Sequence, residues 1–564
     1  MDYLKKYSYW LTDSCFDEDT KRELLKIKGD KKEIEDRFYK DLEFGTGGMR
    51  GVIGAGTNRI NKYTVRKATQ GLANFILDKS NNGQDRGAVI AYDSRHKSDE
   101  FALETALVLN GNGIKAYLFE DLRPTPELSF AVRLLGAAAG VMITASHNPA
   151  EYNGYKVYWE DGGQAVPSLA GEITKEISKI TDYSDIKTMS REEAEKRGLL
   201  KFIGKEVDDC YIEKVKSLCL RPEVIKQVGD EFKIVYTPFH GTGNVPVRRV
   251  LTELGFKNVI VVKEQELPDP DFSTVKYPNP EEHEAFELAV ELAEKENADI
   301  IFGTDPDCDR VGVVVKNREG CYVVLTGNQT GALLLDYILS AKKEKGELPD
   351  NGVMVKTIVT SEMGRAVADY YGVETVDTLT GFKFIGEKIK EFEEKGDKQF
   401  LFGYEESYGY LAGTFVRDKD AVIASMLIAE MALYYKSKGM TLYDALINLF
   451  ERFGYYKEGL ESLKLEGKDG SEKMKHILNG IRQNPPKFIG GKKVTEVRDY
   501  LRGNYNLPKS NVLYFKLDDE SWFCIRPSGT EPKIKVYFSV KGANMEEADK
   551  KFQNLKKSVM KLIG

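Results

Sequence analysis

The chain has few of the residues on which disulfide-bonded and histidine-rich metal proteins depend. Its 564 residues include six cysteines, at positions 15, 210, 219, 308, 321 and 524, and five histidines. The cysteines are widely spaced and form no CxxC pair, so they predict reduced thiols in a cytosolic protein. The histidines are not clustered, which argues against a histidine-rich two-metal site.

Long apolar runs and a strong charge imbalance are also absent. The longest mainly apolar run, residues 134–145, is too short to cross a bilayer. Residues 1–12 contain no apolar stretch of signal-peptide length. The net charge of −7 argues against a general nucleic-acid-binding surface. We therefore expect a cytoplasmic protein that binds neither membranes nor nucleic acid.

The composition is that of a soluble globular protein, with 41% hydrophobic and 30% charged residues. At roughly 150 residues per domain, the length allows about four domains. Alternating strand and helix patterns predict three similar α/β domains with mixed sheets, over residues 1–205, 206–323 and 324–454. Several short strands and two helices predict a smaller α+β domain over residues 455–564.

A serine follows an apolar run in the first predicted domain. Residues 138–143 predict a strand, and the sequence Thr-Ala-Ser146-His147-Asn-Pro149 comes directly after it. Pro149 prevents the strand from continuing. A turn at residues 153–156 would bring the ammonium group of Lys156 back beside Ser146. The same stretch is equally compatible with an ordinary turn, because Ser, Asn and Pro are common turn residues.

Residues 44–51 place four glycines around Arg50. Glycines permit a close approach of the backbone to a ligand. The segment lacks the dinucleotide-binding fingerprint, because Arg50 occupies the third glycine position, and no Walker sequence occurs in the chain. Taken alone, residues 44–51 are typical of a flexible hairpin.

Three aspartates, Asp305, Asp307 and Asp309, directly follow the predicted strand 299–302. In an extended segment this spacing places all three side chains on one side. Three carboxylates facing one point repel each other unless a cation lies among them, and their oxygen atoms suit Mg²⁺ or Mn²⁺. A phosphate on Ser146 could complete the coordination, which would activate that phosphate for in-line displacement.

An EF-hand calcium loop is excluded at this site. Such a loop requires glycine at its sixth position and glutamate at its twelfth. Counted from the first of the three aspartates, these positions hold Arg310 and Lys316.

Two further loops carry polar groups that suit the two ends of a sugar phosphate. The carboxylate of Glu405 and the hydroxyl of Ser407 can bind vicinal sugar hydroxyls. The second loop combines a guanidinium, two hydroxyls and a glycine that frees backbone N–H groups for an anion; it contains Arg526, Ser528, Gly529 and Thr530. Together with the serine and the aspartates, these loops predict a phosphosugar that is handled at both ends.

These motifs resemble the four signature loops of the α-D-phosphohexomutases, in the family's order and over nearly the whole chain. The matching segments are residues 144–149, 153–156, 305–310, 405–409 and 526–532. Residues 44–51, 240–243 and 380–383 are also similar to family segments. The resemblance implies four domains around a central cleft, with one loop from each domain.

The resemblance also implies roles for individual residues. Ser146 is expected to carry the phosphoryl group and, with the three aspartates, to bind Mg²⁺. Glucose 1,6-bisphosphate is expected as intermediate and activator of a mutase reaction. Arg50, Lys156 and His147 are expected to stabilise charge or transfer protons. The substrate-binding set is expected to be Arg310, Lys383, Glu405, Ser407, Arg526, Ser528, Gly529 and Thr530.

Two other functions use some of the same residues. A metal-dependent phosphatase would have to admit water to the phosphoserine, and release of free phosphate would distinguish it. A non-catalytic binder of sugar phosphates would never be phosphorylated on Ser146. All four loops retain reactive residue types, which favours the mutase.

The sugar is suggested by one loop only. The sequence Glu-Glu-Ser-Tyr-Gly at 405–409 resembles the loop of glucose-handling members of the family. Dual glucose and mannose enzymes often carry a histidine there, and none follows in this chain. Residues 158–163 resemble the branch that includes phosphopentomutases. Glucose 1-phosphate is therefore the first expectation, with mannose and pentose phosphates as alternatives.

Overall fold

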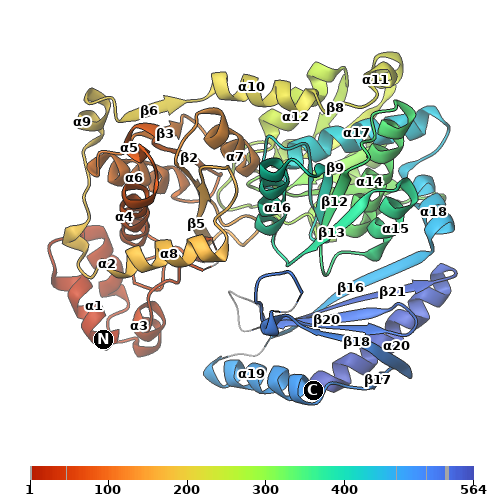
Figure 1. Ribbon diagram of the computed structural model, residues 1–564. Helices are drawn as coiled ribbons and strands as arrows, with labels where there is room; N and C mark the ends of the chain where they lie inside the picture. Colours follow the sequence, from red (N-terminus) through yellow and green to blue (C-terminus); the bar gives the residue numbers. More distant parts are fainter. Residues whose placement is uncertain (1–2, 46, 465–466, 504, 528–532) are drawn as a thin grey trace.

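The computed structural model describes residues 3–45, 47–464, 467–503, 505–527 and 533–564, which form four sheets in chain order (Figure 1). The first three sheets mix parallel and antiparallel strands, and the fourth is antiparallel throughout. The predicted fold class, three α/β units followed by an α+β unit, is confirmed. The exact boundaries after residues 205, 323 and 454 stay a prediction.

The first unit contains a six-stranded sheet in the order β1-β5-β4-β2-β3-β6. Its strands are β1 (Gly48–Val52), β2 (Ala88–Tyr92), β3 (Ala116–Phe119), β4 (Ala139–Ile143), β5 (Tyr152–Trp159) and β6 (Leu200–Ile203). Its helices are α1 (Tyr3–Thr12), α2 (Glu18–Lys26), α3 (Lys31–Phe38), α4 (Lys62–Lys79), α5 (Gly83–Arg86), α6 (Ser98–Gly111), α7 (Thr125–Leu134), α8 (Pro167–Ser178) and α9 (Arg191–Lys196).

The second unit contains a five-stranded sheet in the order β11-β10-β9-β7-β8. Its strands are β7 (Lys233–Thr237), β8 (Asn258–Val261), β9 (Ile300–Thr304), β10 (Val311–Lys316) and β11 (Tyr322–Leu325). Its helices are α10 (Lys205–Lys216), α11 (Pro222–Val228), α12 (Asn244–Leu254) and α13 (Glu287–Glu296).

The third unit contains a four-stranded sheet in the order β13-β12-β14-β15. Its strands are β12 (Gly352–Thr357), β13 (Glu374–Thr378), β14 (Gln399–Glu405) and β15 (Gly409–Ala412). Its helices are α14 (Gly327–Glu344), α15 (Glu362–Tyr371), α16 (Phe382–Lys395), α17 (Ala421–Ser437) and α18 (Leu442–Phe453).

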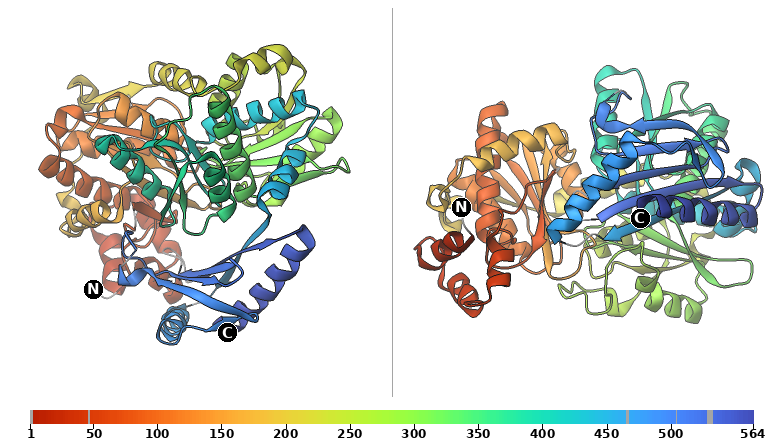
Figure 2. Two further views of the ribbon diagram at one scale, coloured as in Figure 1. Left: turned by 45° about the vertical axis from the view of Figure 1, so that its right-hand side comes forward. Right: turned by 90° about the horizontal axis from the view of Figure 1, so that it is seen from below.

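The C-terminal unit contains the sheet β16-β21-β20-β19-β18-β17. Its elements are β16 (Tyr455–Lys464), α19 (Gly467–Gln483), β17 (Phe488–Ile489), β18 (Lys492–Asp499), β19 (Leu513–Leu517), β20 (Trp522–Pro527), β21 (Lys533–Gly542) and α20 (Met545–Ile563). Figures 1 and 2 show this unit in blue, joined to the rest of the molecule through the connection from α18 to β16.

The first three sheets share one arrangement around a central parallel strand. In each, that strand (β4, β9 or β14) is followed at once by an antiparallel return strand (β5, β10 or β15). The loop between the two strands therefore leaves the sheet at the carboxyl end of a parallel strand. Such ends are where open α/β sheets place their ligand sites.

The structure corrects two predictions for the first unit. Residues 153–156 lie within β5 and are not a turn, because this segment pairs with both β1 and β4. The turn lies just before it, where the Tyr152 N–H donates to the Pro149 carbonyl at 3.1 Å. Of the glycine-rich segment predicted as a flexible hairpin, Gly45 forms an antiparallel bridge with Gly48, and residues 48–51 belong to β1, which pairs with β5. Gly48 permits this pairing, since a Cβ there would lie 2.2 Å from the Tyr155 carbonyl oxygen.

The hydrophobic cores show which units are packed together. One cluster of buried side chains runs from α7 of the first unit through the second and third units, and it includes nearly all of α17. The C-terminal unit has a core of its own. Its contact with the third unit is a smaller apolar cluster that includes Phe384 and Trp522. Within the described residues, no helix has the length and apolar character needed to cross a membrane.

Arg221 joins the second and third units. It is buried, and its guanidinium carbon lies 4.7 Å from the ring centre of Tyr337 and 4.1 Å from that of Tyr434. Its backbone N–H donates to the carboxylate of Glu430 on α17. A desolvated cation between two aromatic faces is a favourable contact, so Arg221 stabilises the packing of these two units.

Candidate active site

Ser146 lies in the loop that follows β4 and adopts a left-handed backbone conformation, with φ of 55°. A residue other than glycine is rarely found there. Its N–H donates to Thr144 Oγ1 at 2.8 Å. Its hydroxyl donates to Asp305 Oδ2 at 2.9 Å, and Oγ lies 3.1 Å from His147 Nδ1. The structure thus brings the predicted serine and the first predicted metal ligand into direct contact.

Asp305, Asp307 and Asp309 lie in a tight turn after β9, and not in the extended segment that their spacing predicts. The Cys308 N–H donates to the Asp305 carbonyl at 2.8 Å, and Cys308 has φ of 52°. The N–H groups of Asp309 and Arg310 donate to Asp305 Oδ1 at 3.0 and 2.9 Å. The turn therefore converges the carboxylates, and one oxygen atom from each lies within 4.8 Å of the others.

The segment 240–243, similar to a family segment in the sequence, packs beneath this turn. Thr242 donates to the Pro306 carbonyl through its N–H at 2.8 Å and through its hydroxyl at 3.0 Å. A Cβ on Gly241 would lie 2.5 Å from Pro306 Cα. Glycine is required at 241 because the two backbones touch there.

Two lysines and a threonine hold Asp307 and Asp309. Lys156 Nζ donates to Asp307 Oδ2 at 2.6 Å and lies 3.4 Å from Asp309 Oδ2. Lys419 Nζ donates to Asp309 Oδ2 at 2.7 Å, and Thr125 Oγ1 donates to Asp307 Oδ2 at 2.7 Å. The carboxylates are thus shared by side chains from all three α/β units.

Burial and neighbouring charges shift the pKa values of Asp305 and Asp307 in opposite directions. Burial, together with the charges of Asp309 and Asp307, raises the pKa of Asp305 well above its usual range. Burial acts in the same direction on Asp307. There the Lys156 ammonium and the donated hydrogen bonds outweigh it, and the pKa falls below its usual range.

The acidic cluster fits a divalent cation. All three aspartates are buried, and Asp307 Oδ1 and Asp309 Oδ1 have no hydrogen-bond partner among the described residues. Buried carboxylate oxygens without a partner are costly and are commonly satisfied by an ion. Oxygen donors of this kind are the ligands that hard cations prefer. The cluster could therefore hold a metal.

The basic residues Arg50, His147 and Arg310 come from β1 and from the loops after β4 and β9. Arg50 Nη1 donates to Asn148 Oδ1 at 2.8 Å, which places β1 against the serine loop. Arg310 Nη1 donates to Glu281 Oε1 at 2.5 Å, and its Nε lies 3.8 Å from Asp309. Burial, followed by the cations Arg310 and Arg50, holds the pKa of His147 well below its usual range, so its ring is neutral.

The loop after β14 supplies the third group of predicted residues. Glu405 is buried and accepts a hydrogen bond from the Gly381 N–H at 2.8 Å, whereas Ser407 is half-buried. Burial and the neighbouring carboxylate raise the pKa of Glu406 to about 7. Burial lowers the pKa of Lys383, at the start of α16, to about 8. The hydrogen bond between Gly381 and Glu405 therefore brings residues 380–383 and 405–407 together.

The C-terminal loop is described only in part. Arg526 lies near the end of β20 and is half-buried, whereas Ser528, Gly529 and Thr530 lie outside the described residues. Arg526 pairs in register with Lys535 on β21. Burial, and then the charge of Arg526, lowers the pKa of Lys535. These two cations make the end of this hairpin electropositive.

Sequence reasoning missed Lys419 and Thr125 as site residues. Both contact the acidic cluster from positions far away in the chain. The run Asp-Lys-Asp before α17 has the appearance of an ordinary polar helix start, and Thr125 stands between two prolines at the start of α7. No local pattern distinguishes either residue.

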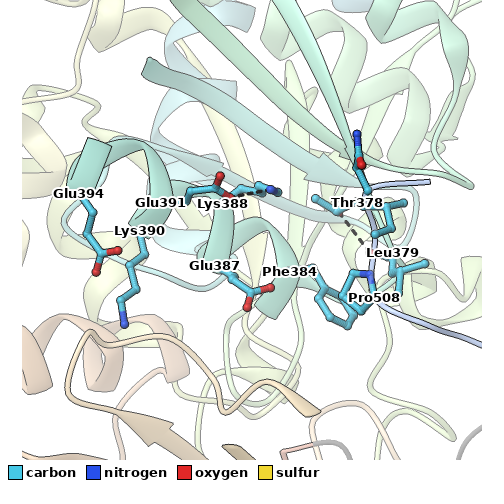
Figure 3. A pocket seen from close by; sticks show the side chains of 11 residues that line it. Thr378, Leu379, Phe384, Glu387, Lys388, Lys390, Glu391, Glu394 and Pro508 are labelled. Atoms are coloured by element: carbon cyan, nitrogen blue, oxygen red, sulfur yellow. Dashed lines mark hydrogen bonds and ion pairs between the residues drawn. The ribbon is translucent and has the colours of Figure 1, made fainter. Parts of the chain in front are cut away.

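A cavity of about 440 Å³ lies beside the site, between α16 and residues 506–508 of the C-terminal unit (Figure 3). All of the charged side chains that line the cavity come from this helix, namely Glu387, Lys388, Lys390, Glu391 and Glu394. None of the proposed active-site residues lines this cavity. The third and C-terminal units are therefore incompletely packed against each other along α16.

The sequence matches four domain profiles of one family in the order of the units. They are described as phosphoglucomutase/phosphomannomutase alpha/beta/alpha domains I, II and III, over residues 41–184, 209–320 and 326–453, and as the C-terminal domain, over residues 479–551. Each profile falls within one of the four units, and strands β6, β11 and β16 lie outside the matched residues.

Solved structures of this family share the fold. The phosphoglucomutase pp63/parafusin from Paramecium, in its open form, has a TM-score of 0.70 at 17% identity and covers 93% of this chain and 96% of its own. A phosphoglucomutase/phosphomannomutase family protein from Burkholderia thailandensis has a TM-score of 0.67 at 18% identity and covers 92% and 97%.

Two bacterial relatives are much closer in sequence. Phosphoglucomutase from Staphylococcus haemolyticus is 39% identical over 535 residues, which are 92% of this chain and 94% of the relative. Phosphoglucomutase from Staphylococcus aureus is 40% identical over 532 residues, which are 92% and 93% of the two chains. With this identity over nearly the full length and all four domains matched in order, the chain belongs to the phosphoglucomutase/phosphomannomutase family.

Proposed function

We propose that the protein interconverts glucose 1-phosphate and glucose 6-phosphate through a phosphorylated Ser146 and a bound glucose 1,6-bisphosphate. The observation that carries the proposal is the 2.9 Å contact between Ser146 Oγ and Asp305 Oδ2, beside two further buried carboxylates. A hydroxyl next to such a cluster is suited to carry a phosphoryl group whose charge a cation neutralises. The relatives named phosphoglucomutase support glucose as the sugar.

The first half-reaction moves the phosphoryl group from the enzyme to the sugar. The bond between phosphorus and Ser146 Oγ breaks while the free hydroxyl of the sugar phosphate forms a bond to phosphorus. The hydroxyl proton is transferred to Ser146 Oγ. His147 is a suitable carrier because its neutral ring lies 3.1 Å from that oxygen, with Lys156 as the alternative.

The second half-reaction is the reverse, with the other phosphate of the bisphosphate returning to Ser146. The enzyme therefore ends each cycle phosphorylated and with no net gain of protons. Arg50 and Lys156 supply positive charge on the serine side of the site. Mg²⁺ would be held by Asp305, Asp307 and Asp309 together with the phosphate on Ser146, and would neutralise charge on the transferred group.

The remaining loops are proposed to hold the part of the substrate that does not react. Glu405 and Ser407 would bind hydroxyls that occupy the same places in both orientations of the sugar. The phosphate that is not transferred would be bound by cations and by the C-terminal loop. These groups are Lys383, Arg310, Arg526, Ser528, Gly529 and Thr530.

The role of Ser146 is tested by replacing it with alanine. We expect Ser146→Ala to lower the rate of isomer formation more than about 10⁴-fold, because it removes the phosphoryl carrier. Ser94→Ala is a matched control, since the Ser94 hydroxyl is buried and has no hydrogen-bond partner among the described residues. Wild-type turnover in Ser146→Ala would refute the proposal. Free phosphate released faster than isomer would indicate a phosphatase instead.

The sugar preference is tested with three 1-phosphates. We expect kcat/KM for glucose 1-phosphate to exceed the values for mannose 1-phosphate and ribose 1-phosphate by about tenfold or more, because a hydroxyl that is misplaced leaves buried polar groups unpaired. Steady-state kinetics with the three substrates measures the ratios. A higher kcat/KM for mannose or ribose would replace glucose in the proposal.

Metal binding is tested through stability, which does not depend on activity. A ligand at about 100 times its Kd stabilises the folded state by about 2.7 kcal/mol, so Mg²⁺ should raise Tm of the wild-type protein. In Asp307→Asn this rise should be largely lost, whereas Asp350→Asn, in an exposed loop, should retain it. Differential scanning calorimetry with and without Mg²⁺ measures both. An equal rise in Asp307→Asn would reject the site.

The proposed phosphate contact of Lys383 predicts a pH dependence. Because its pKa is lowered to about 8, the ammonium form is lost as the pH rises through that value. We expect KM for glucose 1-phosphate to rise between pH 7 and pH 9, and the rise to disappear in Lys383→Arg, which stays charged. Lys388→Arg, on the same helix and paired with Glu391, should behave as the wild type. The same pH profile in Lys383→Arg would rule out this contact.

A further inference from the structure

Arg95 lies in the loop after β2, and its side chain is directed at the backbone of the serine loop. Its Nη1 donates to the carbonyl oxygens of Pro149 at 2.8 Å and Tyr152 at 3.1 Å. Its Nη2 donates to the carbonyl oxygens of Ser146 and Asn148. Three carbonyl groups of the serine loop and that of Tyr152, the first residue of β5, therefore converge on a single guanidinium.

The number of N–H donors on the two terminal nitrogens of Arg95 matches the number of carbonyl acceptors. A guanidinium carries four N–H bonds on its two terminal nitrogens and one on Nε. The four terminal hydrogens match the four carbonyls, whereas Nε lies 3.3 Å from Asp93 Oδ2 as an ion pair and has no hydrogen-bond partner among the described residues. The side chains of Arg95 and Asp93 are both 0% exposed. An ammonium group has only three donors and could not satisfy the same set.

Asp93 links Arg95 to the serine a second time. Its Oδ2 accepts a hydrogen bond from Thr144 Oγ1 at 2.6 Å, and Thr144 Oγ1 in turn accepts the N–H of Ser146. Its Oδ1 accepts from Ser98 Oγ at 2.8 Å. The amide and the carbonyl of Ser146 are therefore both fixed by one buried ion pair.

The second unit covers the other side of Arg95. Phe272 is buried, and its ring centre lies 4.9 Å from the guanidinium carbon of Arg95. Next to this contact, His96 Nε2 lies 2.7 Å from Asp271 Oδ1. The same pair of units meets at the contact between Ser146 and Asp305.

We infer that Arg95 is the positioning residue that holds Ser146 in its reactive conformation, and that Phe272 fixes Arg95 from the second unit. The inference rests on the proposed role of Ser146 as phosphoryl carrier. Ser146 is in a left-handed conformation that is maintained only by its surroundings. Without the guanidinium, four carbonyl oxygens would each lose a hydrogen bond, although the Pro149 carbonyl would keep the one from the Tyr152 N–H. The loop would rearrange to find other partners. Oγ would then leave its place beside Asp305.

The test separates positioning from folding by comparing two arginines of the first unit. Arg86 also donates to two carbonyl oxygens, of Gly136 and Ala137, and pairs with Glu160, but it lies away from the serine loop. We expect Arg95→Ala to lower kcat by about 10²-fold with KM changed less than about threefold, because a displacement of about 1 Å at the reacting atom has this effect. Arg86→Ala should leave both values near the wild type.

Two further measurements distinguish the role of Arg95 from a general loss of structure. The rate at which glucose 1,6-bisphosphate phosphorylates Ser146, followed by intact-protein mass spectrometry, should fall by the same factor as kcat. Millimolar guanidinium should restore part of this rate in Arg95→Ala and none in Ser146→Ala. Arg95→Lys should remain impaired, since an ammonium supplies too few donors.

The results that would overturn the inference about Arg95 differ from those that would overturn the proposed function. Wild-type kcat and Ser146 phosphorylation in Arg95→Ala would overturn the inference and leave the role of Ser146 intact, whereas activity in Ser146→Ala would overturn the proposed function itself. If Arg95→Ala does not fold, Phe272→Leu is used to test the inference instead. It keeps an apolar side chain and should lower the phosphorylation rate several-fold with Tm little changed. An unchanged rate in Phe272→Leu would refute the coupling to the second unit.

Discussion

The proposed activity depends on one contact, in which the hydroxyl of Ser146 meets the carboxylate of Asp305 at 2.9 Å. The two residues belong to different sheets, so their distance is set by the packing between units and not by either loop alone. Thr125 contributes to this packing with an N–H bond to the Asp307 carbonyl and a hydroxyl bond to its carboxylate. The continuous hydrophobic core through the first three units keeps such contacts in register.

Charge balance is the second constraint. Three buried carboxylates could not share one turn without cations nearby, since their mutual repulsion is strong in a medium of low dielectric constant. Lys156 and Lys419 provide two of these cations from the first and third units. Two carboxylate oxygens still have no hydrogen-bond partner within the part of the chain that the structure describes. A divalent ion bound to them would add further positive charge.

Much of this site could be predicted from sequence because its residues stand in short motifs at the ends of apolar strands. Ser146, Asp305 and Glu405 each follow a predicted strand, and the sequence next to each one is sufficient to predict it as a site residue. Lys419 could not be found in this way, because its partner Asp309 is 110 residues away and only the fold brings them together. Local reasoning also mistook the turn of aspartates for an extended segment. The left-handed backbone at Cys308 that makes the turn is unusual for a residue other than glycine.

The antiparallel return strand that follows the central parallel strand in each of the first three sheets has a consequence for how such a protein can diverge. Each active loop is anchored at both ends by a ladder of paired residues, β4 with β5, β9 with β10 and β14 with β15. A loop held in this manner can gain or lose residues at its tip without shifting the register of the strands that carry it. New substrate preferences can thus arise by exchanging one hairpin tip, while the other two, and the scaffold beneath them, keep their coordinates.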